Sequence, residues 1–401
     1  MLICVFTGFS SGLPLYVIYQ LIPYWLRDQG VGLKEIGFFA LVGVPYAWKF
    51  LWSPLMDLYA PPFLGHRRSW MLVTQILLLL SIAAVGWFNP DRSIWTIAYL
   101  AGAMAFFSAS QDIVLDAYRR ELLTEVELGL GNTVHVQAYR IAGLVPGALA
   151  LILADFIPWQ TVFAVVGACM LVGVGLTLAI SEAEAAMPPP TTLQKALEEP
   201  FAEFFHRKGV RGGLLVLAFM FLYKLGDSMA TALSYPFYYD LGFAGTEIGL
   251  IAKNAALWSA IIGGFLAIPV MARMGINRSL WLFGVVQIVS ILGFWLLSEV
   301  GNDRLLLGLV ISFEYLGVGL GTAAFTAYIA RETSIEFAAT QFALLTALTA
   351  LPRTFANATV GAIVEVIGWS EFFILCTVVA IPGMLLLLKV APWNAEQAQP
   401  E

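Results

Sequence analysis

Carboxylate side chains occur in this sequence inside a stretch that is otherwise apolar. The segment "SIWTIAYLAGAMA" (93–105) runs directly into "FFSASQDIVLDAYRREL" (106–122), where Asp112 and Asp116 stand one helical turn apart. A carboxylate inside a lipid bilayer costs about 2.5–3.5 kcal/mol even on lenient insertion scales. Buried acids of this kind carry protons, contact polar ligands or form ion pairs, so the segment points to chemistry inside a membrane.

Basic residues also lie deep in apolar stretches. A helix rises about 1.5 Å per residue and the bilayer core is about 30 Å thick, so the midplane lies roughly ten residues from either end of a span. At that depth Lys and Arg are natural partners of an anionic substrate, although structural ion pairs between helices are the alternative. We expect the groups that bind a substrate carboxylate to come from Arg140, Lys224, Lys253 and Arg353.

Lys224 and Asp227 are three residues apart, which places them on one helix face within pairing distance. Protonation of Asp227 would release Lys224 to hold a substrate carboxylate, so this pair is expected to couple a proton to the substrate. Glu314 and Asp112 are the alternative proton carriers, because both are acids inside expected spans.

Aromatic faces, amides and hydroxyls are typical of sites that bind sugars. Tyr16, Gln20 and Tyr46 lie deep in expected spans, and Gln111 stands beside Asp112. We expect these residues to contact the substrate. Tyrosines nearer the span ends have the alternative role of anchors at the membrane interface.

The composition is that of a polytopic membrane protein. The 401 residues are 60% hydrophobic and 12% charged, with a mean hydropathy of +0.82, whereas soluble domains contain about 25% charged residues. The formal charge of -6 and the lack of a basic patch exclude a nucleic-acid-binding class. Neither the three cysteines nor the three histidines have metal-ligand spacing, and no nucleophile–base pair is visible. We therefore expect no metal, no cofactor and no enzyme activity.

Twelve apolar stretches are long enough to cross a bilayer, which takes about 20 residues. The first begins almost at Met1 and lacks the basic n-region of a signal peptide, so it is expected to be a span. Most basic residues outside the spans fall on the side of the N-terminus, so the positive-inside rule places both termini in the cytoplasm. The expected spans lie near 2–25, 35–59, 69–88, 94–120, 130–154, 160–181, 211–239, 246–270, 279–298, 304–330, 338–366 and 370–390.

Two pairs of short segments repeat in the two sets of six spans. "DQGVGLKEIG" (28–37) matches "DLGFAGTEIG" (240–249), and "PWQTVF" (158–163) matches "GWSEFF" (368–373). A parallel repeat of two six-helix halves is the architecture of major facilitator transporters. We therefore expect an all-α membrane fold of twelve helices in two pseudo-symmetric halves. Its parts are a first bundle (1–181), a cytoplasmic connector with an amphipathic helix (182–210), a second bundle (211–390) and a cytoplasmic tail (391–401).

The loop after the second expected span reads "KFLWSPLMDLYAPPFLGHRRSW" (49–70). Asp57, Gly65, Arg67 and Arg68 resemble the acidic-Gly-basic signature that the major facilitator superfamily carries in this loop. Asp116 lies towards the cytoplasmic end of its own span, close to the same loop. We expect Asp57, Arg67, Arg68 and Asp116 to form an inner gate.

With "ASQDIVLDAY" (109–118), "LYKLGD" (222–227) and "ATQFALLTAL" (339–348), this loop also resembles the AmpG family of muropeptide permeases. The resemblance implies a bacterial inner-membrane importer, driven by protons, for peptidoglycan recycling. Its substrate would be GlcNAc–anhydro-MurNAc, with or without a stem peptide, taken from periplasm to cytoplasm. The expected partners are that small molecule, protons and the bilayer, and we expect a monomer. The alternatives are a transporter of another anionic sugar- or nucleotide-linked solute, similar to acetyl-CoA transporters, and a membrane receptor without transport.

Overall fold

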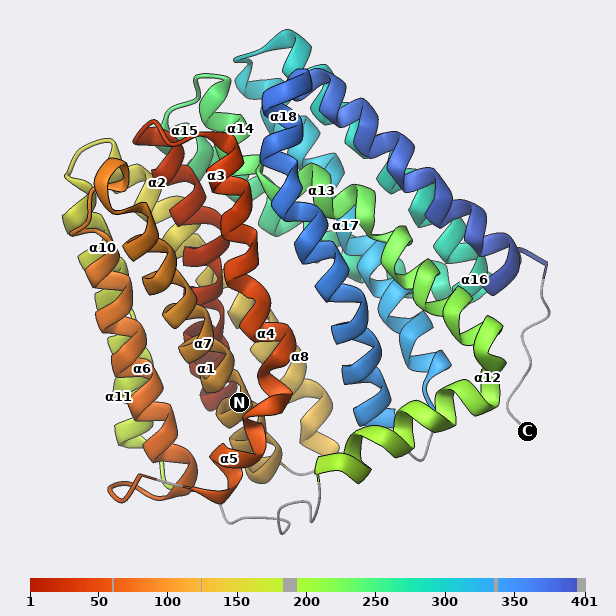
Figure 1. Ribbon diagram of the computed structural model, residues 1–401, viewed down its shortest axis with the longest axis horizontal. Coiled ribbons are helices and arrows are strands. Elements are labelled where there is room, and N and C mark those ends of the chain that lie inside the picture. Colours follow the sequence, from red (N-terminus) through yellow and green to blue (C-terminus); the bar gives the residue numbers. More distant parts are fainter. Residues whose placement is uncertain (60, 124, 183–192, 335–337, 395–401) are drawn as a thin grey trace. The chain divides into compact units, whose positions relative to one another are not determined.

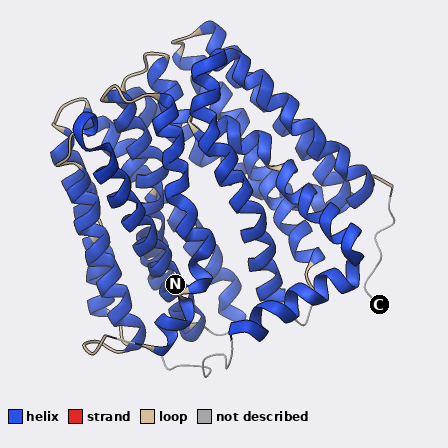
Figure 2. Ribbon diagram, in the orientation of Figure 1, coloured by secondary structure: helices blue, strands red, loops and turns tan. Residues whose placement is uncertain are grey.

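The computed structural model of the chain describes residues 1–59, 61–123, 125–182, 193–334 and 338–394. Every regular element within these ranges is helical (Figure 2). A membrane imposes this, because backbone N–H and C=O groups in hydrocarbon find no water and must be paired inside their own segment. The all-α membrane fold expected from the sequence is therefore confirmed.

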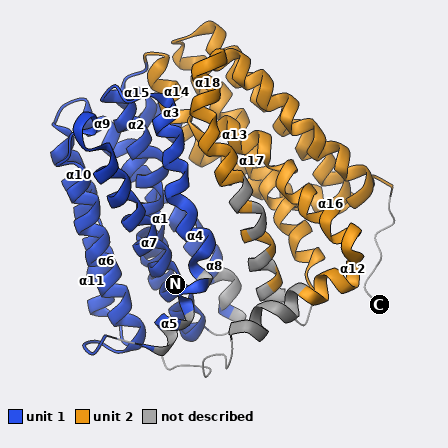
Figure 3. Ribbon diagram, in the orientation of Figure 1, with its two compact units in different colours: residues 1–191, 243–253 blue, residues 192–242, 254–401 orange. Residues whose placement is uncertain are grey.

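The chain forms two compact units (Figure 3), which we call unit 1 (Met1–Thr191 and Phe243–Lys253) and unit 2 (Thr192–Gly242 and Asn254–Glu401). Unit 1 contains α1 (Leu2–Tyr16), η1 (Val17–Leu21), α2 (Ile22–Asp28), α3 (Leu33–Phe38), η2 (Phe39–Gly43), α4 (Val44–Trp48), η3 (Lys49–Leu51), α5 (Ser53–Leu58), α6 (His66–Val85), α7 (Pro90–Leu122), α8 (Glu125–Ala142), η4 (Val145–Leu149), α9 (Ala150–Ala154), α10 (Trp159–Ala168), α11 (Leu171–Ala179), α15 (Gly245–Glu247) and η5 (Ile248–Ala252). Unit 2 contains α12 (Leu193–Tyr223), α13 (Leu225–Ala232), α14 (Ser234–Asp240), α16 (Lys253–Val300), α17 (Arg304–Glu332) and α18 (Ala338–Val390). The first residue of α16, Lys253, belongs to unit 1.

Nine helical stretches in the described residues are long and apolar enough to cross a membrane. Two of the longest helices, α16 and α18, each turn at a glycine with positive φ, Gly275 and Gly368. A span lies on either side of each turn, so the arrangement is consistent with the twelve expected spans. The nine stretches are Leu2–Asp28, His66–Val85, Pro90–Leu122, Gly131–Ala154, Trp159–Ala179, Ala202–Asp240, Gly245–Val300, Arg304–Glu332 and Arg353–Val390.

The stretch expected as one span near 35–59 differs from that expectation. It is divided among α3, η2, α4, η3 and α5, and two of these pieces are 3-10 helix. Pro45 and Pro54 each stand in the first turn of a short helix. A proline has no N–H to continue the preceding helix, so the backbone starts a new helical piece at each proline.

Close helix packing in unit 1 depends on small residues of α1. A Cβ on Gly8 or Gly12 would meet the backbone carbonyl oxygen of His135 or Tyr139, respectively, on α8. Small residues let membrane helices approach each other until van der Waals contact is extensive. Figure 1 shows α1 among α6, α7 and α8, and it packs on α7, α8 and α11.

In unit 2, α12 packs on α18 around a core of aromatic and aliphatic side chains. The helix α12 turns at Gly209, whose φ is 68°. The helical segment before this turn occupies the expected connector, and its Phe204 is buried in the unit 2 core. Lys208 adds an ion pair to Glu332 of α17, at 2.6 Å. Residues 183–192 of the expected connector, and 395–401 of the expected tail, lie outside the described residues.

The internal repeat has a structural counterpart. The indole N–H of Trp159 donates to Asp28 Oδ2 at 2.7 Å, and that of Trp369 donates to Asp240 Oδ2 at 2.9 Å. These four residues come from the two pairs of repeated segments. The same hydrogen bond therefore ties the same two segments of each half together.

Candidate functional site

A polar pocket of about 390 Å³ opens in unit 1 among α1, α7 and α8. Its lining is rich in charged, hydroxyl and aromatic side chains, which is the chemistry expected for a polar solute. Three of the sequence-predicted residues, Tyr16, Asp112 and Arg140, and one predicted gate residue, Asp116, line it. The other lining residues are Ser11, Arg119, His135, Val136 and Tyr139.

Lys253 is buried beside this pocket, with 4% of its surface exposed. Its ammonium group lies 4.3 Å from the centroid of the Tyr16 ring and donates to Gln20 Oε1 at 2.9 Å. Gln20 belongs to η1, a π-helical turn that follows α1 directly. The structure thus brings together three residues that the sequence predicted only as separate deep polar positions.

Arg140 extends the positive charge of this group. Its guanidinium lies within electrostatic range of the Tyr16 hydroxyl, and the Tyr16 and Tyr139 rings are 5.7 Å apart. Neither Arg140 nor Lys253 has an ion-pair partner among the described residues. Two cations without a carboxylate partner make this part of unit 1 suited to an anion. We call Arg140, Lys253, Tyr16 and Gln20 the cation group.

Gly143 leaves the space that Lys253 occupies. A Cβ at Gly143 would stand 2.6 Å from the Lys253 nitrogen and 2.9 Å from the Tyr16 ring. Any other residue type at this position would displace the ammonium or the ring. No local pattern in the sequence distinguishes this glycine from the others.

Asp112 is held as an acceptor at the side of the pocket. The Ser11 hydroxyl donates to its Oδ1 at 2.6 Å, and Lys49 attracts it electrostatically. Asp116, one turn further on, pairs with Arg119 at 2.9 Å. Asp112 is therefore placed to meet a solute in the pocket, and Asp116 is engaged with its own helix.

Unit 2 holds a second group of charges, formed by Lys224, Asp227, Glu314 and Arg353, which we call the acid group. Lys224 donates to Asp227 Oδ2 at 3.0 Å, as their spacing predicts, and both side chains are buried. Glu314 of α17 is fully buried near them, and Arg353 of α18 lies within electrostatic range of Asp227. Two predicted substrate-binding residues and two predicted proton carriers thus lie in one cluster.

Two of the four expected gate residues, Arg67 and Arg68, lie together at the start of α6. Arg67 forms an ion pair with Glu121 at 2.8 Å. Arg68 donates to the carbonyl oxygens of Thr177 and Leu178 at the end of α11. Both arginines also donate their backbone N–H groups to Glu182, which neutralises the start of α6. Asp116 pairs elsewhere, as described above, and the side chain of Asp57 lies outside the described residues.

Two predicted substrate contacts are buried away from the pocket lining. Gln111 has no exposed surface, and neither amide atom has a hydrogen-bond partner in the described part of the chain. The Tyr46 hydroxyl is also buried, within electrostatic range of Asp112. Gln111 therefore faces the core of unit 1, although its neighbour Asp112 faces the pocket.

Sequence reasoning missed Ser11, Arg119, His135 and Tyr139 as lining residues. His135 and Tyr139 are four residues apart, so they share one face of α8, and Arg140 follows Tyr139 directly. That spacing was the available signal. The imidazole Nδ1 of His135 lies 3.2 Å from the Thr7 hydroxyl, which ties it to α1.

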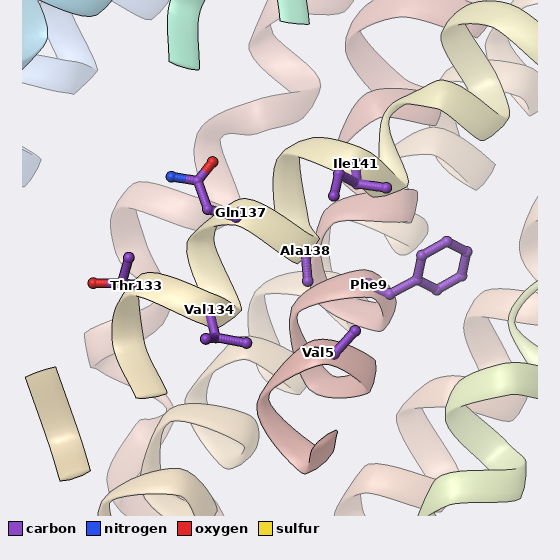
Figure 4. A pocket seen from close by; sticks show the side chains of 7 residues that line it. All are labelled: Val5, Phe9, Thr133, Val134, Gln137, Ala138 and Ile141. Atoms are coloured by element: carbon purple, nitrogen blue, oxygen red, sulfur yellow. The ribbon is translucent and has the colours of Figure 1, made fainter. Parts of the chain in front are cut away.

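A second groove on unit 1, of about 280 Å³, lies between α1 and α8 (Figure 4). Its lining is apolar except for Thr133 and Gln137, and Figure 4 shows the Gln137 amide turned away from α1. It offers no charge to an anionic solute. Within the described residues, no group of three or more His, Cys, Asp or Glu side chains is placed to hold a metal ion.

Comparison with known proteins identifies the family. The Major Facilitator Superfamily profile matches residues 4–357. An uncharacterized protein of Haemophilus influenzae is 49% identical over 99% of this chain and 95% of its own length. The anhydromuropeptide permease of Escherichia coli is 41% identical over 96% of this chain and 78% of its own. The putative transporter AmpG 4 of Rickettsia felis is 31% identical over 95% and 94%.

A solved structure shows the same fold at low sequence identity. The crystal structure of a nucleoside transporter has a TM-score of 0.75 at 13% identity, covering 97% of this chain and 99% of its own. At that identity the likeness concerns the fold alone. The match in fold, the superfamily profile and the identity to the permease agree with one another. The chain therefore belongs to the AmpG family of the Major Facilitator Superfamily, and it is a multi-pass membrane transporter rather than an enzyme.

Proposed function

We propose that this protein imports anhydromuropeptides from the periplasm to the cytoplasm, coupled to protons, for peptidoglycan recycling. The cation group of unit 1 is the observation that carries this proposal, because its two positive charges have no carboxylate partner in the described part of the chain. The relative in Escherichia coli, which bears the name anhydromuropeptide permease, supports the substrate class. We place the protein in the bacterial inner membrane as a monomer, with both termini in the cytoplasm.

The chemistry of the substrate fits the lining of the pocket. The peptide-free form of an anhydromuropeptide carries a lactyl carboxylate. When a stem peptide is attached, that carboxyl group becomes an amide, and the peptide supplies carboxylates of its own. Lys253 and Arg140 would hold one carboxylate, with the fork of Arg140 suited to both of its oxygens. Tyr16 and Tyr139 offer aromatic faces to the sugar rings, and Ser11 and His135 offer hydrogen-bonding groups. Tyr46 and Gln111 lie outside the pocket lining. Their contact with the substrate requires that the pocket deepens when the substrate binds.

The remaining charges have roles in the transport cycle under this proposal. Lys224 and Arg353 of the acid group are proposed anion-binding residues of unit 2, and Asp227, Glu314 or Asp112 carries the proton. Arg67 and Arg68, with Asp57 and Asp116, belong to an inner gate whose contacts break and re-form during the cycle. The ion pair between Arg67 and Glu121 is the described contact that such a gate would use.

Uptake into proteoliposomes tests the proposal. Purified protein is reconstituted, and entry of labelled GlcNAc–anhydro-MurNAc is followed with and without an imposed pH gradient. We expect accumulation above the outside concentration only when the outside is more acidic. No uptake under any gradient would remove the proposed substrate, and uptake that ignores pH would remove proton coupling alone.

The same preparation addresses the alternatives. Unlabelled acetyl-CoA and other anionic sugar- or nucleotide-linked solutes are added as competitors. Stronger competition by one of these than by unlabelled anhydromuropeptide would assign the transporter to that solute. Binding of anhydromuropeptide without any flux would instead support a receptor.

A further inference from the structure

The two carboxyl groups of the acid group have unequal surroundings. Asp227 Oδ2 accepts from the Lys224 ammonium at 3.0 Å, so this carboxylate has a cation in direct contact. Glu314 has no exposed surface, and among the described residues it forms no ion pair; its polar neighbours include the Asp227 carboxyl and the Ser290 hydroxyl. The two acids nevertheless lie close enough to interact electrostatically.

The surroundings of Glu314 are poor in positive charge. The groups that face it are Asp227 and Lys224 at the start of α13, Ser290 of α16, Tyr238 of α14 and Cys376 of α18. Lys224 is the only cation in this set, and it already contacts Asp227. Arg353 interacts with Asp227. An ionised Glu314 would therefore be a buried charge without its own counter-ion.

Burial of an unpaired carboxylate is far more costly than burial of the neutral acid. When two carboxyl groups share a site, like-charge repulsion keeps one of them protonated. The contact with Lys224 favours ionisation of Asp227, so the proton belongs on Glu314. We propose that Glu314, and not Asp227, carries the transported proton, while Asp227 stays ionised and holds Lys224 in place.

This proposal rests on proton-coupled transport as proposed above, and it names the group that performs the coupling. With Glu314 neutral, the acid group can accept an anionic part of the substrate at Lys224. When the Glu314 O–H bond breaks and its proton passes to water on the cytoplasmic side, a second carboxylate appears beside Lys224. That carboxylate competes with the substrate anion for Lys224, so loss of the proton favours release of the substrate.

Asp112 is a weaker carrier on the same grounds. Its oxygen accepts a hydrogen bond from Ser11, and Lys49 attracts it. It also lies in an open pocket, where water reaches it. Asp112 thus has a hydroxyl donor and a nearby cation, whereas the Lys224 ammonium beside Glu314 already contacts Asp227.

Two assays on proteoliposomes of the full-length protein separate proton coupling from substrate movement. In the first, labelled GlcNAc–anhydro-MurNAc with a stem peptide, which supplies more than one carboxylate, accumulates under an imposed pH gradient while a trapped pH indicator records proton entry. In the second, labelled substrate outside exchanges with unlabelled substrate inside at equal pH, which requires no net proton movement. We expect Glu314→Gln, a neutral match for the protonated acid, to keep exchange and to lose both accumulation and proton entry.

Two further variants bracket this result. Glu299→Gln makes the same chemical change at an exposed carboxylate near the end of α16, which contacts Ser370 of α18. This variant should behave as the wild type. Asp227→Asn should still show substrate-dependent proton entry, with a raised KM because Lys224 loses its partner. If Glu314→Gln also loses exchange, Glu314→Asp decides, and we expect it to keep both exchange and proton entry.

Accumulation with normal proton entry in Glu314→Gln would overturn the assignment. The same holds if Asp227→Asn alone abolishes proton entry, or if Glu314→Asp is inactive in both assays. Failure of the wild type to move anhydromuropeptide in either assay would instead overturn the proposed function and, with it, this assignment. A wild type that exchanges the substrate but ignores the pH gradient would remove proton coupling as a whole.

Discussion

At the scale of single residues, the Lys253 ammonium stands out because both of its partners are neutral. The Tyr16 ring and the Gln20 amide oxygen orient it but leave its charge unbalanced. A buried cation is stable only if hydrogen bonds and nearby charge replace the water that it has lost. An arriving carboxylate supplies the missing negative charge, so binding of an anion stabilises the protein as well as the ligand.

Replacement of Lys253 by Gln should weaken substrate binding. The amide keeps a donor for Gln20 but lacks the charge, and a hydrogen bond to a charged group is worth about 1.5–3 kcal/mol. That loss corresponds to a rise in KM of roughly 10- to 150-fold. Initial uptake rates over a range of substrate concentrations measure it, with Lys389→Gln on the exposed end of α18 as the matched control. An unchanged KM would show that Lys253 does not contact the substrate.

At the scale of elements, the approach of α1 to α8 fixes the geometry of the pocket. These helices carry Tyr16, His135, Tyr139 and Arg140, so a change in their separation moves much of the lining. Gly12 meets the backbone of Tyr139 directly, whereas the position of Gly102 on α7 faces open space. Backbone against backbone leaves no flexible group that could move aside.

Gly12→Ala should destabilise the protein, and Gly102→Ala should not. Overpacking of a close contact costs about 1–3 kcal/mol because the helices must separate. The melting temperature of the purified protein in mild detergent measures the effect. If the two variants melt at the same temperature, the contact between α1 and α8 is less tight than the structure indicates.

The sequence predicted contacts within one helix better than contacts between helices. The pair of Lys224 and Asp227 follows from a spacing of three residues and is present in the structure. Lys253 and Gln20 are far apart in the chain, and no local pattern indicates that they meet. Gln111 shows that adjacency in the sequence does not predict a shared site either, since neighbouring residues on a helix point about 100° apart. Its position beside Asp112 therefore did not place it in the pocket.

The breaks in the helical backbone near 35–59 could not be predicted from the sequence either. Its composition is that of one span, and hydropathy predicts nothing about breaks within it. The prolines that divide it were visible in the sequence, but prolines are also tolerated inside membrane helices, as Pro14 is in α1. The tertiary structure decides which of the two outcomes occurs.

At the scale of the whole molecule, the internal repeat is more than a likeness of sequence. Trp159 and Asp28 in one half repeat as Trp369 and Asp240 in the other, with the same atoms joined. A second contact occurs at equivalent positions of the two halves, but the residue types differ. Arg67 pairs with Glu121 in the first half, and the positions 210 residues later, Asn277 and Arg331, are joined by a hydrogen bond of 2.8 Å. The two halves thus keep the same connections while their chemistry diverges.

Trp159→Phe and Trp369→Phe should destabilise the protein to similar extents. Each loses one hydrogen bond near the surface, worth about 0.5–1.5 kcal/mol. The two sites share no partner, so the double variant should lose the sum within about 0.5 kcal/mol. Unfolding in detergent measures all three variants, with Trp87→Phe, at an exposed indole, as the control. A large effect at one site and none at the other would contradict the structural equivalence.

The boundary between the two units falls immediately after Lys253, inside a helical path that continues without interruption into α16. The nitrogen that completes the cation group of unit 1 is thus borne by the residue at which the backbone passes to unit 2. The η5 turn precedes Lys253 and α16 begins at it, so no loop separates this residue from either element. Lys253 marks one of the three points at which the backbone passes between the units, and its side chain belongs to the cation group.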